Sequence, residues 1–217
     1  MKVIIYVEGI SDKLAMEVLL KDLIYQKSLE GIEIGFFEAP SGDKKESVLN
    51  KVPVKAVNIL RNDAEAVVVA IPDLYPTNKG FPHGTHEELI IGLENNFRKE
   101  WLRKQGPEDA RVYQRFRAFC FKHDLEALIL AAHEALKERL NSENLVQEWT
   151  IPVEEQDGLH PPKYIVEKLF RDHGQKYREK IDAPLILSRA EYRMIAERCY
   201  QCFRPFVAFL ESLTKDR

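Results

Sequence analysis

The chain has 217 residues, of which 45% are hydrophobic, enough to fill the core of one α/β domain with or without a helical extension. Its 32 Lys and Arg residues against 35 Asp and Glu residues leave a net charge of −3, which excludes a global basic field of the kind that attracts nucleic acid but leaves room for a local basic patch. Three cysteines argue against a disulfide framework, and the sequence shows neither a signal peptide nor a run of about 18 apolar residues, so we expect a cytoplasmic protein that does not cross a membrane.

The N-terminal stretch predicts a buried strand followed by a helix. Residues 3–7 form an unbroken apolar run that is rich in β-branched side chains, which is typical of a central strand. Glu8 ends this run, Ser11 is the expected N-cap of the following helix, and Gly31 stops that helix. An acid at the C-terminal end of a buried strand lies where open α/β sheets bind ligands. The alternative is that Glu8 only caps the adjacent helix.

The next stretch predicts two further strands. Residues 32–37 alternate between apolar and other side chains, and 66–71 form a second continuous apolar run that ends just before Asp73. Between them, residues 43–60 read as helical, with an interruption at Pro53. Two strand-then-helix units leading into a third strand predict a parallel sheet with right-handed crossovers.

The rest of the chain predicts helices, one strand near a sheet edge and a long loop. The loop spans 72–85, and its length suggests a functional role. We divide the chain into an α/β core, 1–140, and a helical C-terminal extension, 141–217, packed on that core as one compact unit. The expected elements beyond the loop are a helix at 86–104, an edge strand within 111–122, a helix at 123–140, an irregular stretch at 148–159, a helix at 164–170, a helix from the capping box at 188–191 to about 202, and a last helix from 205.

Glu8 and Asp73 are the first candidates for chemistry, because each follows a buried strand. If the two strands are neighbours, the carboxylates converge and repel each other unless a cation lies between them. A hard divalent cation such as Mg²⁺ (or Mn²⁺) resolves the repulsion and serves phosphate chemistry. Asp12 and Glu126 are candidates for completing the site. For Asp124 the simpler interpretation is a cap of the following helix.

Basic residues give weaker support for a phosphate-containing substrate. Lys44 and Lys45 follow a Ser-Gly turn and could contact a phosphate. The segments 98–104 and 111–117 hold a run of Arg and Lys side chains that we place near the same edge of the sheet, although a solvated helix face is the more common origin of such a run.

The motifs taken together resemble those of Toprim domains. The segment Val7-Glu8-Gly9-Ile10-Ser11-Asp12 resembles their opening motif, especially in the overcoming-lysogenization-defect nucleases, and the strand ending at Asp73 resembles the second motif, Asp-x-Asp. The segment Lys122-His123-Asp124-Leu125-Glu126-Ala127-Leu128 resembles the "His-Glu-x-Glu-Ala" signature of a Toprim-like family, number 4276 among the domains of unknown function. Two further elements of that family resemble Pro161-Pro162-Lys163 and Cys202-Phe203-Arg204-Pro205-Phe206.

This resemblance implies a Toprim-like open sheet and a set of roles. Glu8 would act as general acid/base or metal ligand, and Asp73 would hold Mg²⁺. The second Asp of the motif is replaced by Tyr75, so one ligand is missing, and Glu126 could take its place. His123 and Lys163, in the family's own motifs, join Lys44 as candidate substrate-binding residues.

The function implied is a Mg²⁺-dependent nuclease or phosphodiesterase acting on DNA or RNA, working beside an ATPase partner in prokaryotic defence. The alternative is a non-catalytic Toprim-like module that binds a partner protein or a nucleic acid, which the loss of an acid at Tyr75 favours. A third option is hydrolysis of a small phosphate ester.

Overall fold

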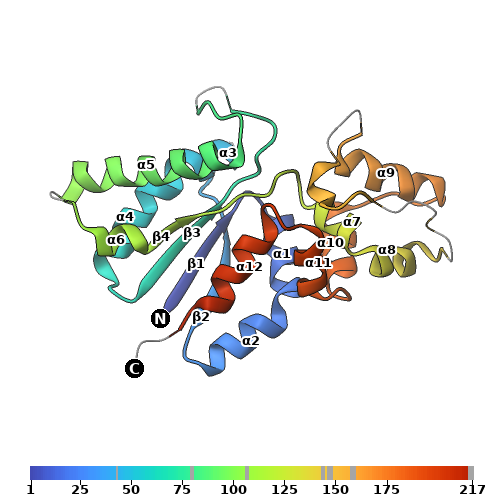
Figure 1. Ribbon diagram of the computed structural model, residues 1–217, viewed down its shortest axis with the longest axis horizontal. Helices are drawn as coiled ribbons and strands as arrows, with labels where there is room; N and C mark the ends of the chain where they lie inside the picture. The colour runs from blue at the N-terminus through green and yellow to red at the C-terminus, as the bar shows by residue number, and fades with distance from the viewer. Residues whose placement is uncertain are drawn as a thin grey trace.

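The computed structural model describes residues 1–42, 44–78, 81–105, 108–142, 145, 149–156 and 160–214. Within them the chain forms a four-stranded, entirely parallel sheet in the order β2-β1-β3-β4 (Figure 1). The strands are β1 (Lys2–Val7), β2 (Glu33–Glu38), β3 (Ala66–Ile71) and β4 (Phe116–Ala118). The predicted α/β class with an open parallel sheet is confirmed.

The helices and turns of helix surround this sheet on both faces. They are α1 (Ile10–Leu19), α2 (Lys21–Leu29), α3 (Lys44–Glu46), the π-helical turn η1 (Ser47–Lys51), α4 (Val52–Asn62), α5 (His86–Gln105), α6 (Ala110–Gln114), α7 (Glu126–Ala131), α8 (His133–Leu140), the 3₁₀ turn η2 (Val153–Glu155), α9 (Pro162–Asp172), α10 (Glu179–Leu187), α11 (Tyr192–Arg198) and α12 (Phe203–Ser212).

The two central strands supply both halves of the hydrophobic core. Val3, Ile5 and Val7 of β1 point to the face covered by α1 and α12, whereas Tyr6 points to the face covered by α4 and α5 (Figure 1). Every residue of β3 is buried, because its alternate side chains enter both halves. This two-sided burial is the physical reason for the unbroken apolar runs in the sequence.

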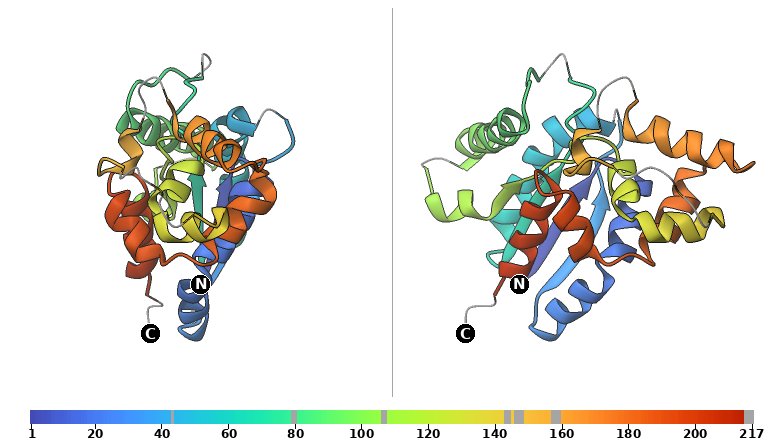
Figure 2. Two further views of the ribbon diagram at one scale, coloured as in Figure 1. Left: turned by 90° about the vertical axis from the view of Figure 1, so that its right-hand side faces the viewer. Right: turned by 45° about the vertical axis from the view of Figure 1, so that its right-hand side comes forward.

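The C-terminal segment shares the core with the N-terminal one. Helix α10 packs along α1, and α12 lies over the sheet, where the ring of Phe206 meets those of Phe36 and Phe119. Figure 2 shows α8 and α9 reaching away from the sheet beyond α7. The division at residue 140 stays a prediction. Among the helices described, none combines the length and the apolar character that crossing a membrane requires.

Several predicted boundaries are wrong for identifiable reasons. The first helix begins at Ile10, because Gly9 rather than Ser11 is its N-cap, and a break at Leu20 separates α1 from α2. Pro53 does not break the helical path: it lies in the first turn of α4, directly after the π-helical turn η1. Likewise, the capping box predicted at Ser188 is not formed: Ser188 ends α10, and Glu191 is the N-cap of α11.

The stretch predicted as one edge strand over 111–122 is instead a helical turn, α6, followed by the short β4. Arg115 marks the junction, because its guanidinium donates to the backbone carbonyls of Leu60, Asp63, Ala64 and Ala66. The helix predicted over 123–140 begins at Glu126 and breaks at Ala132 into α7 and α8. A helix that the sequence did not predict, α10, contains an internal proline, Pro184. Residues 43, 79–80, 148 and 157–159 of the predicted segments lie outside the described residues.

Candidate active site

The strand order brings together the two acids that the sequence singled out. Strands β1 and β3 are parallel neighbours, with Val7 opposite Ile71, so Glu8 and Asp73 leave the sheet side by side. The backbone N–H of Asp73 donates to Oε1 of Glu8 at 3.0 Å. The prediction that these acids converge is confirmed, and the roles assigned to them stay predictions.

A third acid, Asp124, reaches the same place from the next strand. Beyond β4 the chain continues alongside β3, with Phe121 bridged to Asp73, and Asp124 follows three residues later. These acids line a cleft of about 340 Å³, together with Lys44, Lys45, Tyr75, Pro76, Thr77 and Asn78. Helix capping, the simpler interpretation of Asp124, is wrong, because the N-cap of α7 is Leu125, whose side chain makes no capping hydrogen bond. Its position after a strand was the signal that could have identified it.

The environment of the cleft disfavours negative charge. Burial raises the pKa of Glu8 to about 7, against the opposing effects of the Asp73 N–H and Lys45, while Asp12 and Asp124 add to the rise. Burial also raises the pKa of Asp73 well above its usual range, and the neighbouring carboxylates of Glu8, Asp12 and Asp124 raise it further. Without a cation, the surroundings of Glu8 and Asp73 therefore favour their protonated forms over their charged forms.

The two lysines after the Ser-Gly turn behave differently. Lys45 is buried, and its ammonium donates to the carbonyl of Leu74 at 2.9 Å and to that of Pro76. Burial lowers the pKa of Lys45, and the charges of Glu8 and Asp73 oppose that effect. Lys44 is exposed at the cleft and extends across Gly9. Lys44 therefore has the freedom to contact a substrate, whereas Lys45 supports the loop that follows β3.

Asp12 lies beside the cleft, and one of its oxygens is engaged. Its Oδ2 accepts from the N–H of Gly9 at 2.9 Å, which caps α1. Burial raises the pKa of Asp12 to about 6, with Glu179 and Asp124 adding to the rise and the Gly9 N–H and Lys44 opposing it. Asp12 thus contributes to the negative field around Glu8 and Asp73 from outside the cleft wall.

Glu126 lies behind the cleft and is fully buried, with 0% of the residue exposed. Neither of its carboxyl oxygens has a partner at hydrogen-bond geometry among the described residues. Burial raises its pKa to about 7, while the charge of Lys163 and the nearby Tyr177 hydroxyl lower it in part. Glu126 is not part of the cleft wall, so Asp124, rather than Glu126, joins Glu8 and Asp73 there.

The two other predicted substrate-binding residues are also placed. The ammonium of Lys163 pairs with Oε2 of Glu179 at 2.8 Å. Burial lowers the pKa of Lys163, but the pair with Glu179 and the charge of Glu126 outweigh that effect and raise it. His123 is buried, and its ring stacks on that of Tyr75, with 5.4 Å between the centroids. It supports a cleft residue rather than facing the cleft itself.

We tested whether these residues fit a divalent cation. In the part of the chain that the structure describes, no three His, Cys, Asp or Glu side chains are grouped so as to enclose a metal ion. Mg²⁺ does not need such a cage, since it is commonly held by one or two carboxylates while keeping several waters and contacting substrate phosphates. Glu8, Asp73 and Asp124 follow three neighbouring strands and line one cleft, and an arrangement of carboxylates of this kind fits that mode of binding.

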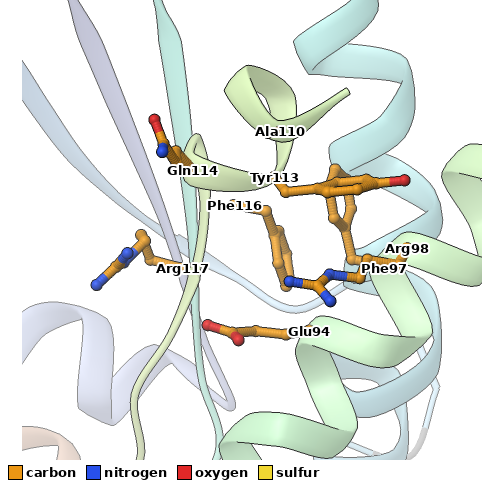
Figure 3. Close-up of a pocket in the computed structure, with 8 residues that line it drawn as sticks. All are labelled: Glu94, Phe97, Arg98, Ala110, Tyr113, Gln114, Phe116 and Arg117. Atoms are coloured by element: carbon orange, nitrogen blue, oxygen red, sulfur yellow. The ribbon is translucent and has the colours of Figure 1, made fainter. Parts of the chain in front are cut away.

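The basic run predicted near this edge lies elsewhere. Arg98 and Arg117 line a separate pocket at the start of β4, where Arg98 covers the ring of Tyr113 and the rings of Phe97 and Phe116 stack (Figure 3). Arg117 is paired with Val69 within β3, whereas Asp73 lies beyond the C-terminal end of that strand, and neither arginine lines the cleft of the acids. Placing them at the active edge was wrong, because that inference ignored the direction of α5 and β4.

Comparisons with known proteins agree with this architecture. The model of the family described as Domain of unknown function (DUF4276) matches residues 7–211. Among solved structures, the chain is similar to the C-terminal region of the Burkholderia pseudomallei OLD protein, with 14% identity, 96% of each chain covered and a TM-score of 0.50. It also matches the C-terminal region of the Xanthomonas campestris pv. campestris OLD protein, with 13% identity, 97% of this chain and 98% of that one covered, and a TM-score of 0.40. No curated protein matches the sequence. At this identity the Burkholderia likeness shows a shared fold, in agreement with the predicted Toprim-like relation.

Proposed function

The chain belongs to the family described as Domain of unknown function (DUF4276), and from its cleft we propose that it is a Mg²⁺-dependent phosphodiesterase of Toprim type that cleaves nucleic acid. The observation that supports this most directly is the meeting of Glu8, Asp73 and Asp124 at the C-terminal edge of a parallel sheet, in one cleft with Lys44. Open α/β sheets bind ligands at this edge, and an excess of carboxylate there favours a divalent cation.

We assign each residue of the cleft a role that fits its surroundings. Asp73 and Asp124 would hold Mg²⁺, which supplies charge neutralisation for the phosphate under attack. Glu8, whose Oε1 accepts from the N–H of Asp73 in the cleft, would act as general acid/base. Lys44 is exposed at the cleft and would contact a phosphate of the strand. Glu126 and Lys163, behind the cleft, would set the charge around Asp124.

A second candidate function is a Toprim-like binding module without catalysis. Tyr75 in place of the motif's second aspartate, together with the lack of an enclosed three-ligand site among the described residues, favours it. Both candidate functions require that the chain binds a nucleic acid, an ATPase partner, or both, as the resemblance implies.

A cleavage assay separates the candidates. The purified chain is incubated with labelled single- and double-stranded DNA and RNA, with Mg²⁺ or Mn²⁺, alone and with an ATPase partner. Glu8→Gln should lower the rate at least about 100-fold. Glu33→Gln makes the same change at an exposed position at the other end of the sheet, beside Lys2, and should leave the rate unchanged.

Each outcome decides between the candidates. Cleavage that survives Glu8→Gln contradicts the role of Glu8. Cleavage of bis(p-nitrophenyl) phosphate without cleavage of any polynucleotide supports a hydrolase of small phosphate esters. No cleavage of any substrate, with the partner present, contradicts the enzymatic proposal and favours the binding module.

A further inference from the structure

Tyr75 is an aromatic side chain that stands at the mouth of the carboxylate cleft. It lines the cleft together with Glu8, Asp73 and Lys44, and 38% of the residue is exposed. We propose that Tyr75 is a stacking platform for an unpaired nucleobase, which makes single-stranded nucleic acid the substrate class of this site. This inference rests on the proposed function only in taking nucleic acid as the ligand.

The ring of Tyr75 is already ordered by a neighbour. It stacks on the ring of His123 with an interplanar angle of 28°, and His123 is buried. Tyr75 also lines the cleft, and more than a third of the residue is exposed, so a second partner can reach it from the cleft. A nucleobase added there would extend an existing stack, so little conformational entropy would be lost on binding.

The backbone on both sides of Tyr75 is also fixed. The buried ammonium of Lys45 donates to the carbonyl of Leu74, before Tyr75, and to that of Pro76, after it. The ring of His83, itself buried, contacts the same Leu74 carbonyl through Nε2 at 3.1 Å. An aromatic side chain whose neighbouring backbone is held in place is preorganised for binding, because it does not have to rearrange when the ligand arrives.

The surroundings match a nucleotide rather than an apolar ligand. Lys44, Thr77 and Asn78 line the same cleft and offer a cation and polar groups for phosphate and sugar. The acids that would bring Mg²⁺ to the scissile phosphate lie within this cleft as well. In a duplex each base is already stacked and paired, so its face is not available to Tyr75. The platform therefore favours single strands or unpaired ends.

The test uses short strands with the fluorescent purine 2-aminopurine at one position, in DNA and in RNA. Binding is measured on the full chain carrying Glu8→Gln, so that the strand is not cut. In this background Tyr75→Leu keeps apolar volume but removes the ring, whereas Tyr75→Phe and Tyr75→Trp keep a ring. We expect Tyr75→Leu to weaken binding of single strands about tenfold and to abolish the quenching of 2-aminopurine. Both ring-keeping variants should retain the quenching, and duplex binding should be the same in all variants.

Thermal unfolding shows whether each variant is folded, and Tyr75→Phe must match the parent there. Equal affinity and equal quenching for Tyr75→Leu and the ring-keeping variants would overturn the proposal, as would an equal loss for duplex and single strands. The DNA and RNA arms identify which strand the platform accepts. Failure of the proposed function gives a different pattern, in which the chain with Glu8 intact cuts nothing while quenching that depends on the Tyr75 ring persists.

Discussion

Two buried glutamates of this chain are held in opposite ways. Glu154, 2% exposed, lies under the start of α12, where its Oε1 accepts from the N–H groups of Cys202 at 2.9 Å and Phe203 at 3.0 Å. Its Oε2 accepts from the N–H of Gln201 at 2.7 Å. Glu126, behind the cleft and 0% exposed, has no hydrogen-bond partner of normal geometry among the described residues.

The difference separates acids that serve the fold from acids that serve the site. A buried carboxylate whose oxygens accept hydrogen bonds stabilises its surroundings. Glu154 does so by accepting from the backbone N–H groups at the start of a helix. A buried carboxyl without partners costs free energy in its charged form, and Glu126 is such a group. The same residue type at the same depth can thus have opposite effects on stability.

The largest effect should follow from Glu154→Gln. The amide places an NH₂ where one oxygen now accepts, so at least one of the three backbone N–H groups of residues 201–203 loses its partner. We expect the free energy of unfolding to fall by about 3 kcal/mol at pH 7, because unsatisfied buried donors and lost bonds to a charged group each cost roughly 1–3 kcal/mol. Urea denaturation measures this. A loss smaller than about 1 kcal/mol would contradict the role of Glu154 as a remote helix cap.

The same chemical change at Glu126 should act in the opposite direction. Because burial raises the pKa of Glu126 from 4.5 to about 7, the folded chain holds a proton there that the unfolded chain has released. Its contribution to stability is therefore complete below about pH 4.5 and is lost as the pH rises through 7. Glu126→Gln stays neutral, so we expect it to be more stable than the parent by about 2 kcal/mol at pH 8.

This comparison is made by urea denaturation from pH 5 to pH 8 in EDTA, so that no divalent cation stabilises the charged form. The gain from Glu126→Gln should shrink toward zero at pH 5. Glu17→Gln, a partly exposed change on α1, serves as the control and should show no such trend. A gain that is equal at both ends of the pH range would contradict burial as the cause, and a loss at pH 8 would show that the charged form of Glu126 has a partner.

The strands could be predicted from the sequence because their signal is local. The runs at 3–7 and 66–71 are apolar throughout, and this pattern follows directly from burial on both faces of a sheet. The helix breaks at Leu20 and Ala132 could not be predicted, since neither position carries Gly or Pro, the residues that usually mark a break in sequence. Alternation within 111–122 predicts a strand over that stretch, yet its first part forms a helical turn, at whose end Arg115 binds four backbone carbonyls.

The site was predictable only in part, for a similar reason. Glu8 and Asp73 each follow an obvious strand, so their meeting needed no more than the assumption that the strands are neighbours. Asp124 follows a strand of only three residues, and a capping role explained it equally well from sequence alone. The different roles of Lys44 and Lys45 depend on which of the two side chains is buried. Two adjacent lysines look alike in the sequence, so the sequence does not show which one that is.

The smallest effect tests Lys44, on the exposed side of the cleft. A Cβ at Gly9 would lie 3.1 Å from Nζ of Lys44, and its three nearest neighbouring atoms all belong to the Lys44 side chain. The backbone of Gly9 is extended, with a φ of −147°, so alanine is allowed there. We expect Gly9→Ala to change the free energy of unfolding by less than about 0.5 kcal/mol, because the exposed Lys44 can move aside. Single-strand binding should weaken about threefold, as expected for a displaced phosphate contact.

Gly174→Ala is the opposite control: its φ of 69° strains alanine, so stability should fall by about 1 kcal/mol while binding stays constant. Unchanged binding in Gly9→Ala would place Lys44 outside the substrate path and leave the acids and Tyr75 as the contacts of the cleft.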